Sequence, residues 1–184
     1  MRKLDKTLVL VGMMGAGKTS VGRRLATVLG VPFKDADAEI ETAAGCTVNE
    51  IFVRFGEPEF RSGERKVIHR LLFEAPHVLA TGGGAVIDAD TRACIKERGI
   101  SIWLKAPLDL LVERVLRKDN RPLLRNTDMR ETLKRLLSER EAYYAEADIT
   151  IESDSGPRDT VVKRVLAALD ARAGEQNPAP GAQS

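Results

Sequence analysis

The chain contains 184 residues and has a formal net charge of +2; 43% of its residues are hydrophobic and 30% are charged. This length suits a single domain, and so small a net charge argues against a protein that binds nucleic acid through a basic surface. No apolar run approaches the roughly 18 residues that a membrane-spanning helix needs.

The first residues, MRKLDKTLVLVGMMGA, superficially fit a secretory signal, with a charged start, an apolar stretch and small residues. Asp5 interrupts the positive charge, Gly12 and Gly15 interrupt the apolar segment, and no small-residue cleavage site follows. A buried parallel strand explains the same apolar run. The two cysteines fit no zinc or redox spacing. We therefore expect a cytoplasmic protein with no membrane or nucleic-acid partner.

Short β-branched runs alternate with longer helical patterns along the chain. Strands are expected at residues 7–11, 32–34, 77–80, 100–105 and 148–152. Helices are expected at 18–29, 48–55, 58–73, 90–98, 108–118, a stretch ending near 145, and 157–172. This alternation predicts an α/β fold in which helices cover both faces of a parallel sheet. Residues 1–173 would form one domain, and the Pro-, Gly- and Ala-rich residues 174–184 a disordered tail.

A phosphate-binding motif follows the first expected strand. Gly12-x4-Gly17-Lys18-Thr19 matches G-x-x-x-x-G-K-[ST] and leads into a helix, as the motif requires. Its backbone N–H groups would point at phosphate oxygens, Lys18 would reach the β- and γ-phosphates, and Thr19 would ligate Mg²⁺. The motif predicts nucleotide binding, but GTPases, ATPases and small-molecule kinases all share it.

Two aspartates follow the second expected strand. Because Asp35 and Asp37 lie two residues apart at a strand end, their side chains can project the same way. One could help to hold Mg²⁺, and the other could orient or deprotonate an attacking hydroxyl. A calcium loop is excluded, since Ile40 stands at the turn position that requires glycine. Capping of the next helix by either aspartate is an alternative compatible with catalysis.

Two arginines stand where helical patterns do not favour them. The helix ending near 145 has an apolar stripe of Met129, Leu133, Leu136, Tyr143 and Ala147. Arg140 falls on this stripe, and an inward guanidinium needs an anionic partner. Pro58 is the expected first helical residue, so Arg61 lies in a first turn, where a cation opposes the helix dipole. Both could bind a substrate carboxylate; the alternative is ordinary ion pairing, of Arg61 with Glu57 or Glu64 for example.

Two further segments could approach a ligand. Pro122 forces Arg121 out of helical geometry, so a mobile loop could carry Arg121 to the transferring phosphate. Arg117, on the preceding helix, is expected to lie on a solvated surface. Residues 82–84 are three glycines after a strand, and they would let backbone N–H groups approach a ligand closely.

The chain resembles the shikimate kinase family, in the nucleoside-monophosphate-kinase-like branch of P-loop proteins. The matching stretches, in order from residue 8 to about 150, are GMMGAGKTSVGRRLA, FKDADAEIE, IFVRFGEPEFRSGE, TGGGAV, RPLL and the ER of SEREAYY with its trailing AD. The resemblance implies a three-layer P-loop fold with a five-stranded parallel sheet in the order 2-3-1-4-5. It further implies a mobile lid at about 117–128, a monomer, and transfer of the ATP γ-phosphate to the 3-hydroxyl of shikimate with Mg²⁺.

The same resemblance implies roles for individual residues. Catalytic roles are implied for Asp37, Lys18 and Arg121. ATP binding is implied for Gly12, Met13, Met14, Gly15, Ala16, Gly17, Lys18, Thr19, Ser20, Arg114 and Arg121. Shikimate binding is implied for Asp37, Arg61, Gly82, Gly83, Gly84 and Arg140. Metal binding is implied for Thr19 and Asp35.

Two other functions compete with this interpretation. One is a gluconate-type or nucleotide kinase on the same fold, against which only the paired arginines, the three glycines and the context of Asp37 argue. The other is a catalytically silent P-loop binding module. Such a module would be expected to have lost Asp37, Lys18 or Arg121, and the sequence has all three.

Overall fold

The computed structural model describes residues 4–118 and 126–176. The strands are β1 (Thr7–Val11), β2 (Phe33–Asp35), β3 (Val78–Ala80), β4 (Gly99–Lys105) and β5 (Ile149–Glu152). The helices are α1 (Lys18–Leu29), α2 (Ala36–Ala44), α3 (Val48–Leu72), α4 (Ala89–Arg98), α5 (Leu108–Lys118), α6 (Asn126–Tyr144) and α7 (Arg158–Gln176), with a 3-10 turn, η1, at Ala85–Ile87.

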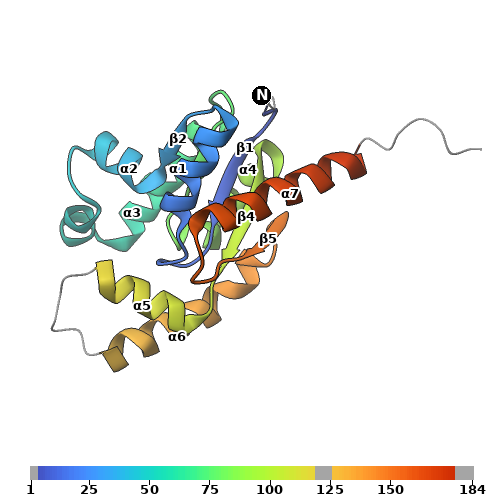
Figure 1. Cartoon of the computed structure of the whole chain (residues 1–184). Coiled ribbons are helices and arrows are strands. Elements are labelled where there is room, and N and C mark those ends of the chain that lie inside the picture. Colours follow the sequence, from blue (N-terminus) through green and yellow to red (C-terminus); the bar gives the residue numbers. More distant parts are fainter. Residues whose placement is uncertain (1–3, 119–125, 177–184) are drawn as a thin grey trace, which may run out of the picture.

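The strands form one parallel sheet in the order β2-β3-β1-β4-β5, which confirms the expected fold. β1 lies at its centre, where Leu10 pairs with Ala80 on one side and Ile102 on the other. All five residues of β1 are buried because helices cover both faces, and the four that follow the buried Thr7 are accordingly all aliphatic. Figure 1 shows α1 and α7 side by side on one face of the sheet, with α4 on the other.

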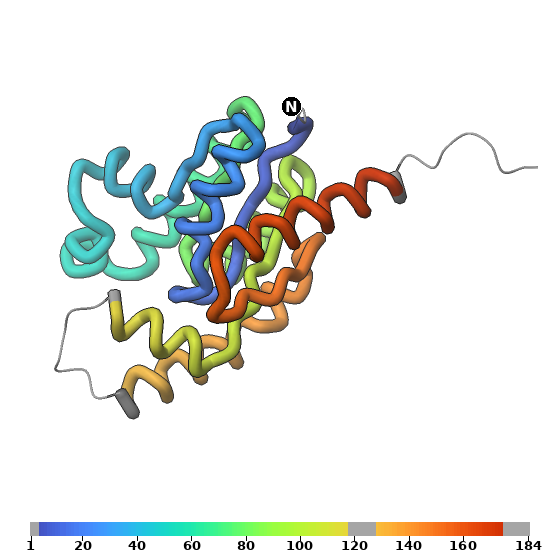
Figure 2. The backbone as a smooth tube through the Cα atoms, in the orientation of Figure 1, coloured from blue at the N-terminus to red at the C-terminus, as the bar shows by residue number. Residues whose placement is uncertain are grey.

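Two pairs of helices flank the end of the sheet at which the strands finish. α2 packs against α3, and α5 packs against α6. In Figure 2, the α5–α6 pair lies below the carboxyl ends of the strands and the α2–α3 pair lies beside them. In sheets of this kind ligands bind outside the carboxyl ends of the strands, so the two pairs stand on either side of the expected ligand position.

Several boundaries differ from the sequence-based expectation. α2 is an additional helix, and it begins directly after β2. Within α3, however, the non-helical Gly56 (φ +80°, ψ 174°) separates two helical segments, which confirms the two helices expected at 48–55 and 58–73. α7 continues to Gln176, so the first three residues of the expected tail are helical. Most of the expected lid, including Arg121, and the rest of the tail lie outside the described residues.

The predicted apolar stripe is confirmed, since Leu133 lies in the core and Met129, Leu136, Tyr143 and Ala147 pack against it, and Tyr144 adds to it. Leu133 and Tyr144 are fully buried, whereas Tyr143 is only half-buried. The Tyr144 ring lies 5.9 Å from the ring of Trp103 in β4, which fixes the end of α6 against the sheet. Arg140 is four residues before Tyr144 and is therefore on the same face of the helix. Within the described ranges, no helix is both long and apolar enough to cross a membrane.

Candidate active site

The phosphate loop connects β1 to α1 and has a backbone that only glycine adopts easily. Gly12, Gly15 and Gly17 have φ values of +135°, +82° and +97°. A Cβ atom on Gly12 would also lie 2.8 Å from the carbonyl oxygen of Leu104 in β4. The Nζ of Lys18 donates hydrogen bonds to the carbonyls of Gly12 (2.6 Å) and Met13 (2.9 Å), so its cation lies within the loop.

Asp35 joins the end of β2 to the phosphate loop. Its Oδ2 accepts a 2.9 Å hydrogen bond from the hydroxyl of Thr19 in the first turn of α1. Its Oδ1 accepts a 3.2 Å hydrogen bond from the N–H of Asp37, which makes Asp35 the N-cap of α2. The capping alternative is thus confirmed for Asp35, and it leaves the carboxylate beside Thr19.

Asp37 lies in the first turn of α2, two residues beyond the end of β2 at Asp35. Its side chain is exposed on one side, while the surrounding protein removes much of the water from the other. This desolvation raises the pKa of Asp37, and the neighbouring charge of Asp35 adds to the rise; Lys18 and Arg61 act in the opposite direction. Asp37 therefore holds its proton more strongly than an ordinary aspartate does.

Arg61 on α3 reaches the turn formed by residues 82–84. Its Nη1 donates a 2.7 Å hydrogen bond to Glu64, and its Nη2 lies 3.3 Å from Oε1 of the exposed Glu57. A Cβ atom on Gly84 would lie 2.5 Å from Nη2 of Arg61. Both expected ion pairs of Arg61 are therefore present, and its guanidinium also lies directly on the glycine turn.

Glu64 is a buried carboxylate at the same turn. Its side chain is 3% exposed, and its Oε1 has no hydrogen-bond partner among the described residues. Burial raises the pKa of Glu64 against the opposing effect of Arg61. A Cβ atom on Gly82 would meet Oε1 of Glu64 at 2.6 Å and Oδ1 of Asp37 at 3.3 Å. Glycine is thus needed at 82 and 84 because side chains crowd the turn; neither residue has a positive φ.

Arg140 approaches the turn from the opposite side. A Cβ atom on Gly83 would lie 3.4 Å from its Nη1. Its Nε is buried without a hydrogen-bond partner among the described residues, and its charge acts on both Glu64 and Tyr144. The structure therefore brings Arg61 and Arg140 together at the glycine turn, with Asp37 beside Gly82.

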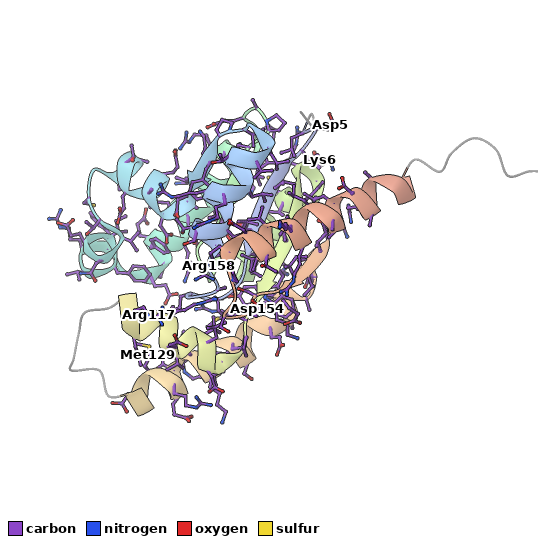
Figure 3. The ribbon with its side chains drawn as sticks, viewed as in Figure 1. Asp5, Lys6, Arg117, Met129, Asp154 and Arg158 are labelled. Carbon is purple, nitrogen blue, oxygen red and sulfur yellow. The ribbon has the colours of Figure 1, made fainter. Side chains whose placement is uncertain are left out.

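A second group of cations lies at the other end of the phosphate loop. Arg114 donates to the carbonyls of Gly15 (3.2 Å) and Asp154 (2.6 Å). Arg158 lies where the loop after β5 enters α7 (Figure 3), and a Cβ atom on Gly17 would be 3.0 Å from its Nη1. Burial, followed by the charge of Arg158, lowers the pKa of Arg114. Because the positive charges of Arg114 and Arg158 act on each other beside the phosphate loop, this position favours the binding of an anionic ligand.

Two other arginines, Arg117 and Arg121, were also considered in the sequence. Arg117 is 74% exposed and pairs with Glu113, which confirms its solvated position. Arg121 lies outside the described residues. Sequence reasoning missed Tyr144, which lies in the core beside the predicted stripe residue Tyr143, and it missed Arg158. The signal for Arg158 was available, since a cation in a first helical turn is the feature that singled out Arg61.

Phosphoryl transfer to a small molecule is the chemistry that this fold and these charges support, which places the protein in the P-loop class of small-molecule kinases. A family model described as shikimate kinase matches residues 14–170. The chain belongs to the shikimate kinase family.

Individual similar proteins support this family assignment. A shikimate kinase of Caulobacter vibrioides is 57% identical over 164 residues, which cover 89% of this chain and 82% of the relative. The structure of shikimate kinase from Acinetobacter baumannii in complex with shikimate is 41% identical, with a TM-score of 0.85 over 91% of this chain and 94% of that one. A gluconokinase from Sinorhizobium meliloti is 20% identical, with a TM-score of 0.62 over 95% and 97% of the two chains, and shares the fold alone.

Proposed function

We propose that this protein transfers the γ-phosphoryl group of ATP to the 3-hydroxyl of shikimate. The observation that carries the proposal is the position of Asp37 between two sets of charges. On one side is Lys18 of the phosphate loop; on the other are Arg61 and Arg140 at the glycine turn. A molecule bearing both a carboxylate and a hydroxyl would fit these charges with its hydroxyl directed at Asp37.

In the proposed reaction, Asp37 orients the acceptor hydroxyl and receives its proton. A new bond forms between the acceptor oxygen and the γ-phosphorus, while the bond from that phosphorus to the bridging oxygen breaks and ADP leaves. The raised pKa of Asp37 favours its protonated product form. Lys18 and the N–H groups of the phosphate loop would stabilise the phosphates during transfer.

Thr19 at the start of α1 and Asp35 at the end of β2 suit a magnesium ion bound together with ATP. Mg²⁺ prefers oxygen ligands and is often held by one or two protein groups plus substrate phosphates. The hydroxyl of Thr19 and the carboxylate of Asp35, 2.9 Å apart, would supply such oxygens. The ion would neutralise phosphate charge and orient the phosphates.

The remaining residues are proposed to bind either the acceptor or the nucleotide. Arg61 and Arg140 would bind the carboxylate of shikimate, with the backbone of residues 82–84 beside it. Arg114, together with Arg158, would lie on the nucleotide side of the loop. Arg121, outside the described residues, is proposed to meet the phosphates. Monomeric state and cytoplasmic location stay predictions from the sequence.

An assay of ADP release, coupled to a nicotinamide readout, tests the proposal. Shikimate, gluconate and nucleoside monophosphates are offered in parallel at equal concentration with ATP and Mg²⁺. We expect shikimate alone to stimulate ADP release well above the rate without acceptor. Stimulation by another acceptor and not by shikimate would contradict the proposal. Binding of ATP with no stimulation by any acceptor would favour the silent binding module.

A further inference from the structure

The hydroxyl of Tyr144 lies among the residues of the proposed acceptor site. It donates a 2.5 Å hydrogen bond to the carbonyl of Gly83, and its oxygen lies 3.5 Å from the sulfur of Met13. Because a tyrosine hydroxyl has one hydrogen, which Gly83 accepts here, we treat the approach to Met13 as packing. With its ring beside Trp103, this one fully buried side chain touches the glycine turn, the phosphate loop and β4.

This hydrogen bond determines the direction of a second backbone group. A peptide unit is planar and trans, so the carbonyl of Gly83 and the N–H of Gly84 point in opposite directions. With the carbonyl directed at Tyr144, the N–H must point away from it. Glycine has the greatest conformational freedom of any residue, and the peptide joining two glycines is accordingly the least restrained by its own side chains. A donor on a rigid, buried ring supplies the missing restraint.

The same peptide lies between the two guanidinium groups. Gly84 abuts Arg61, and Gly83 abuts Arg140, as the 2.5 Å and 3.4 Å approaches to their absent Cβ atoms show. Arg140 and Tyr144 come from successive turns of α6, so the helix carries both a cation and the group that orients the turn. A carboxylate accepts several charge-assisted hydrogen bonds, and a correctly directed N–H beside two cations adds to them.

We infer that Tyr144 is a positioning residue for the acceptor carboxylate, acting through the peptide between Gly83 and Gly84. The inference rests on the proposed function, because it concerns how a carboxylate-bearing acceptor is held. Tyr144 itself contacts neither the reacting hydroxyl nor the phosphates in this account. Its removal should therefore weaken acceptor binding and leave nucleotide binding in place.

The test is Tyr144→Phe, which keeps the buried ring and removes only the hydroxyl. We expect the KM for shikimate, and its Kd measured by calorimetry, to rise about tenfold, because the Gly83 carbonyl loses its donor. The KM for ATP should change by less than about twofold, since the phosphate-loop backbone is untouched. In thermal unfolding, the rise in Tm produced by shikimate should be smaller than in the wild type, while the rise produced by ADP should be unchanged. This comparison can be made even if the variant is less stable, because each rise is measured against the same variant without ligand.

Tyr143→Phe is the matched control. In the wild type, the ring of Tyr143 packs against the guanidinium of Arg92, whose central carbon lies 4.7 Å from the ring centroid. We expect the KM values of this variant for shikimate and for ATP to equal those of the wild type. If Tyr144→Phe raised both KM values equally, or lowered stability without affecting shikimate binding, Tyr144 would be merely structural and the inference wrong. Wild-type protein without shikimate-dependent ADP release would instead overturn the proposed function, and the inference with it.

Discussion

Arg61 and Glu64, one turn apart on α3, are joined by a 2.7 Å hydrogen bond that holds the guanidinium against the glycine turn. The second oxygen of the same carboxylate lies against Gly82. A buried carboxylate therefore supports the cation that we propose for acceptor binding. Burying a charge is unfavourable even when it is paired, so this arrangement should make stability depend on pH.

Glu64→Gln should alter that pH dependence. Burial raises the pKa of Glu64 in the folded protein above its unfolded value, so the folded state binds the proton more tightly. The stability that protonation of Glu64 contributes is fully present below the pKa of Glu64 in the unfolded chain. It is lost as the pH rises through the pKa of Glu64 in the folded protein. Glutamine has no such titration. The Tm of the variant minus that of the wild type should therefore increase between about pH 4 and about pH 7.

Glu57→Gln is the control for this measurement. Glu57 also pairs with Arg61, but its side chain is 63% exposed. Its replacement should leave the Tm difference nearly constant over the same range. A Glu64→Gln difference that stayed flat, or fell with rising pH, would show that burial of Glu64 does not govern the titration.

Asp37→Asn should separate catalysis from nucleotide binding. The amide keeps the size of the side chain but cannot accept the proton of the acceptor hydroxyl. We expect kcat to fall about 10²- to 10⁴-fold, the usual contribution of a general base. The Kd for ATP, measured by calorimetry, should change by less than about threefold, since Asp37 contacts no phosphate in the proposal. Near-normal kcat would exclude Asp37 as the proton acceptor.

Asp35→Asn should separate the metal role of Asp35 from its capping role. Asparagine caps helices about as well as aspartate, so α2 and the Tm should be little affected. A neutral amide is a poorer ligand for Mg²⁺ than a carboxylate. The Mg²⁺ concentration giving half-maximal activity should thus rise several-fold, with partial recovery of rate at high Mg²⁺. An unchanged Mg²⁺ requirement would confine Asp35 to capping.

The sheet and the phosphate loop were predictable because their signals are local. The apolar run at residues 8–11, bounded by the glycines of the phosphate loop, favours a strand buried on both faces. The spacing of Gly12, Gly17 and Lys18 is almost sufficient by itself to identify the phosphate loop. The strand order came from the family resemblance, and the structure confirms it. Residues 36–44 were not assigned as a helix, because their apolar face is weak and Asp35 both ends the strand and caps the helix.

The acceptor side was only partly predictable, because it depends on distant contacts. Sequence indicated Arg61 and Arg140 as unusual, but it could not show that both lie at the glycine turn, Arg61 at Gly84 and Arg140 at Gly83. The glycines at 82 and 84 were attributed to ligand approach, which stays a prediction; the sequence could not show that side chains from α3 and α2 also occupy the space that a Cβ would need. The stripe of α6 was predicted through Tyr143, which does pack against the core, and Tyr144 was missed because neighbouring tyrosines satisfy a helical period almost equally well.

Arg140→Ala should weaken acceptor binding selectively. Its Nη1 reaches the turn at Gly83, on the side away from the nucleotide cations. Loss of a charge-assisted contact costs about 1.5–3 kcal/mol, so the KM for shikimate should rise roughly 10- to 150-fold. The KM for ATP should stay within about threefold. Arg135→Ala on the same helix removes a 63% exposed cation paired with Glu139 and should leave both constants unchanged. Equal rises in the two KM values of Arg140→Ala would make Arg140 a structural residue.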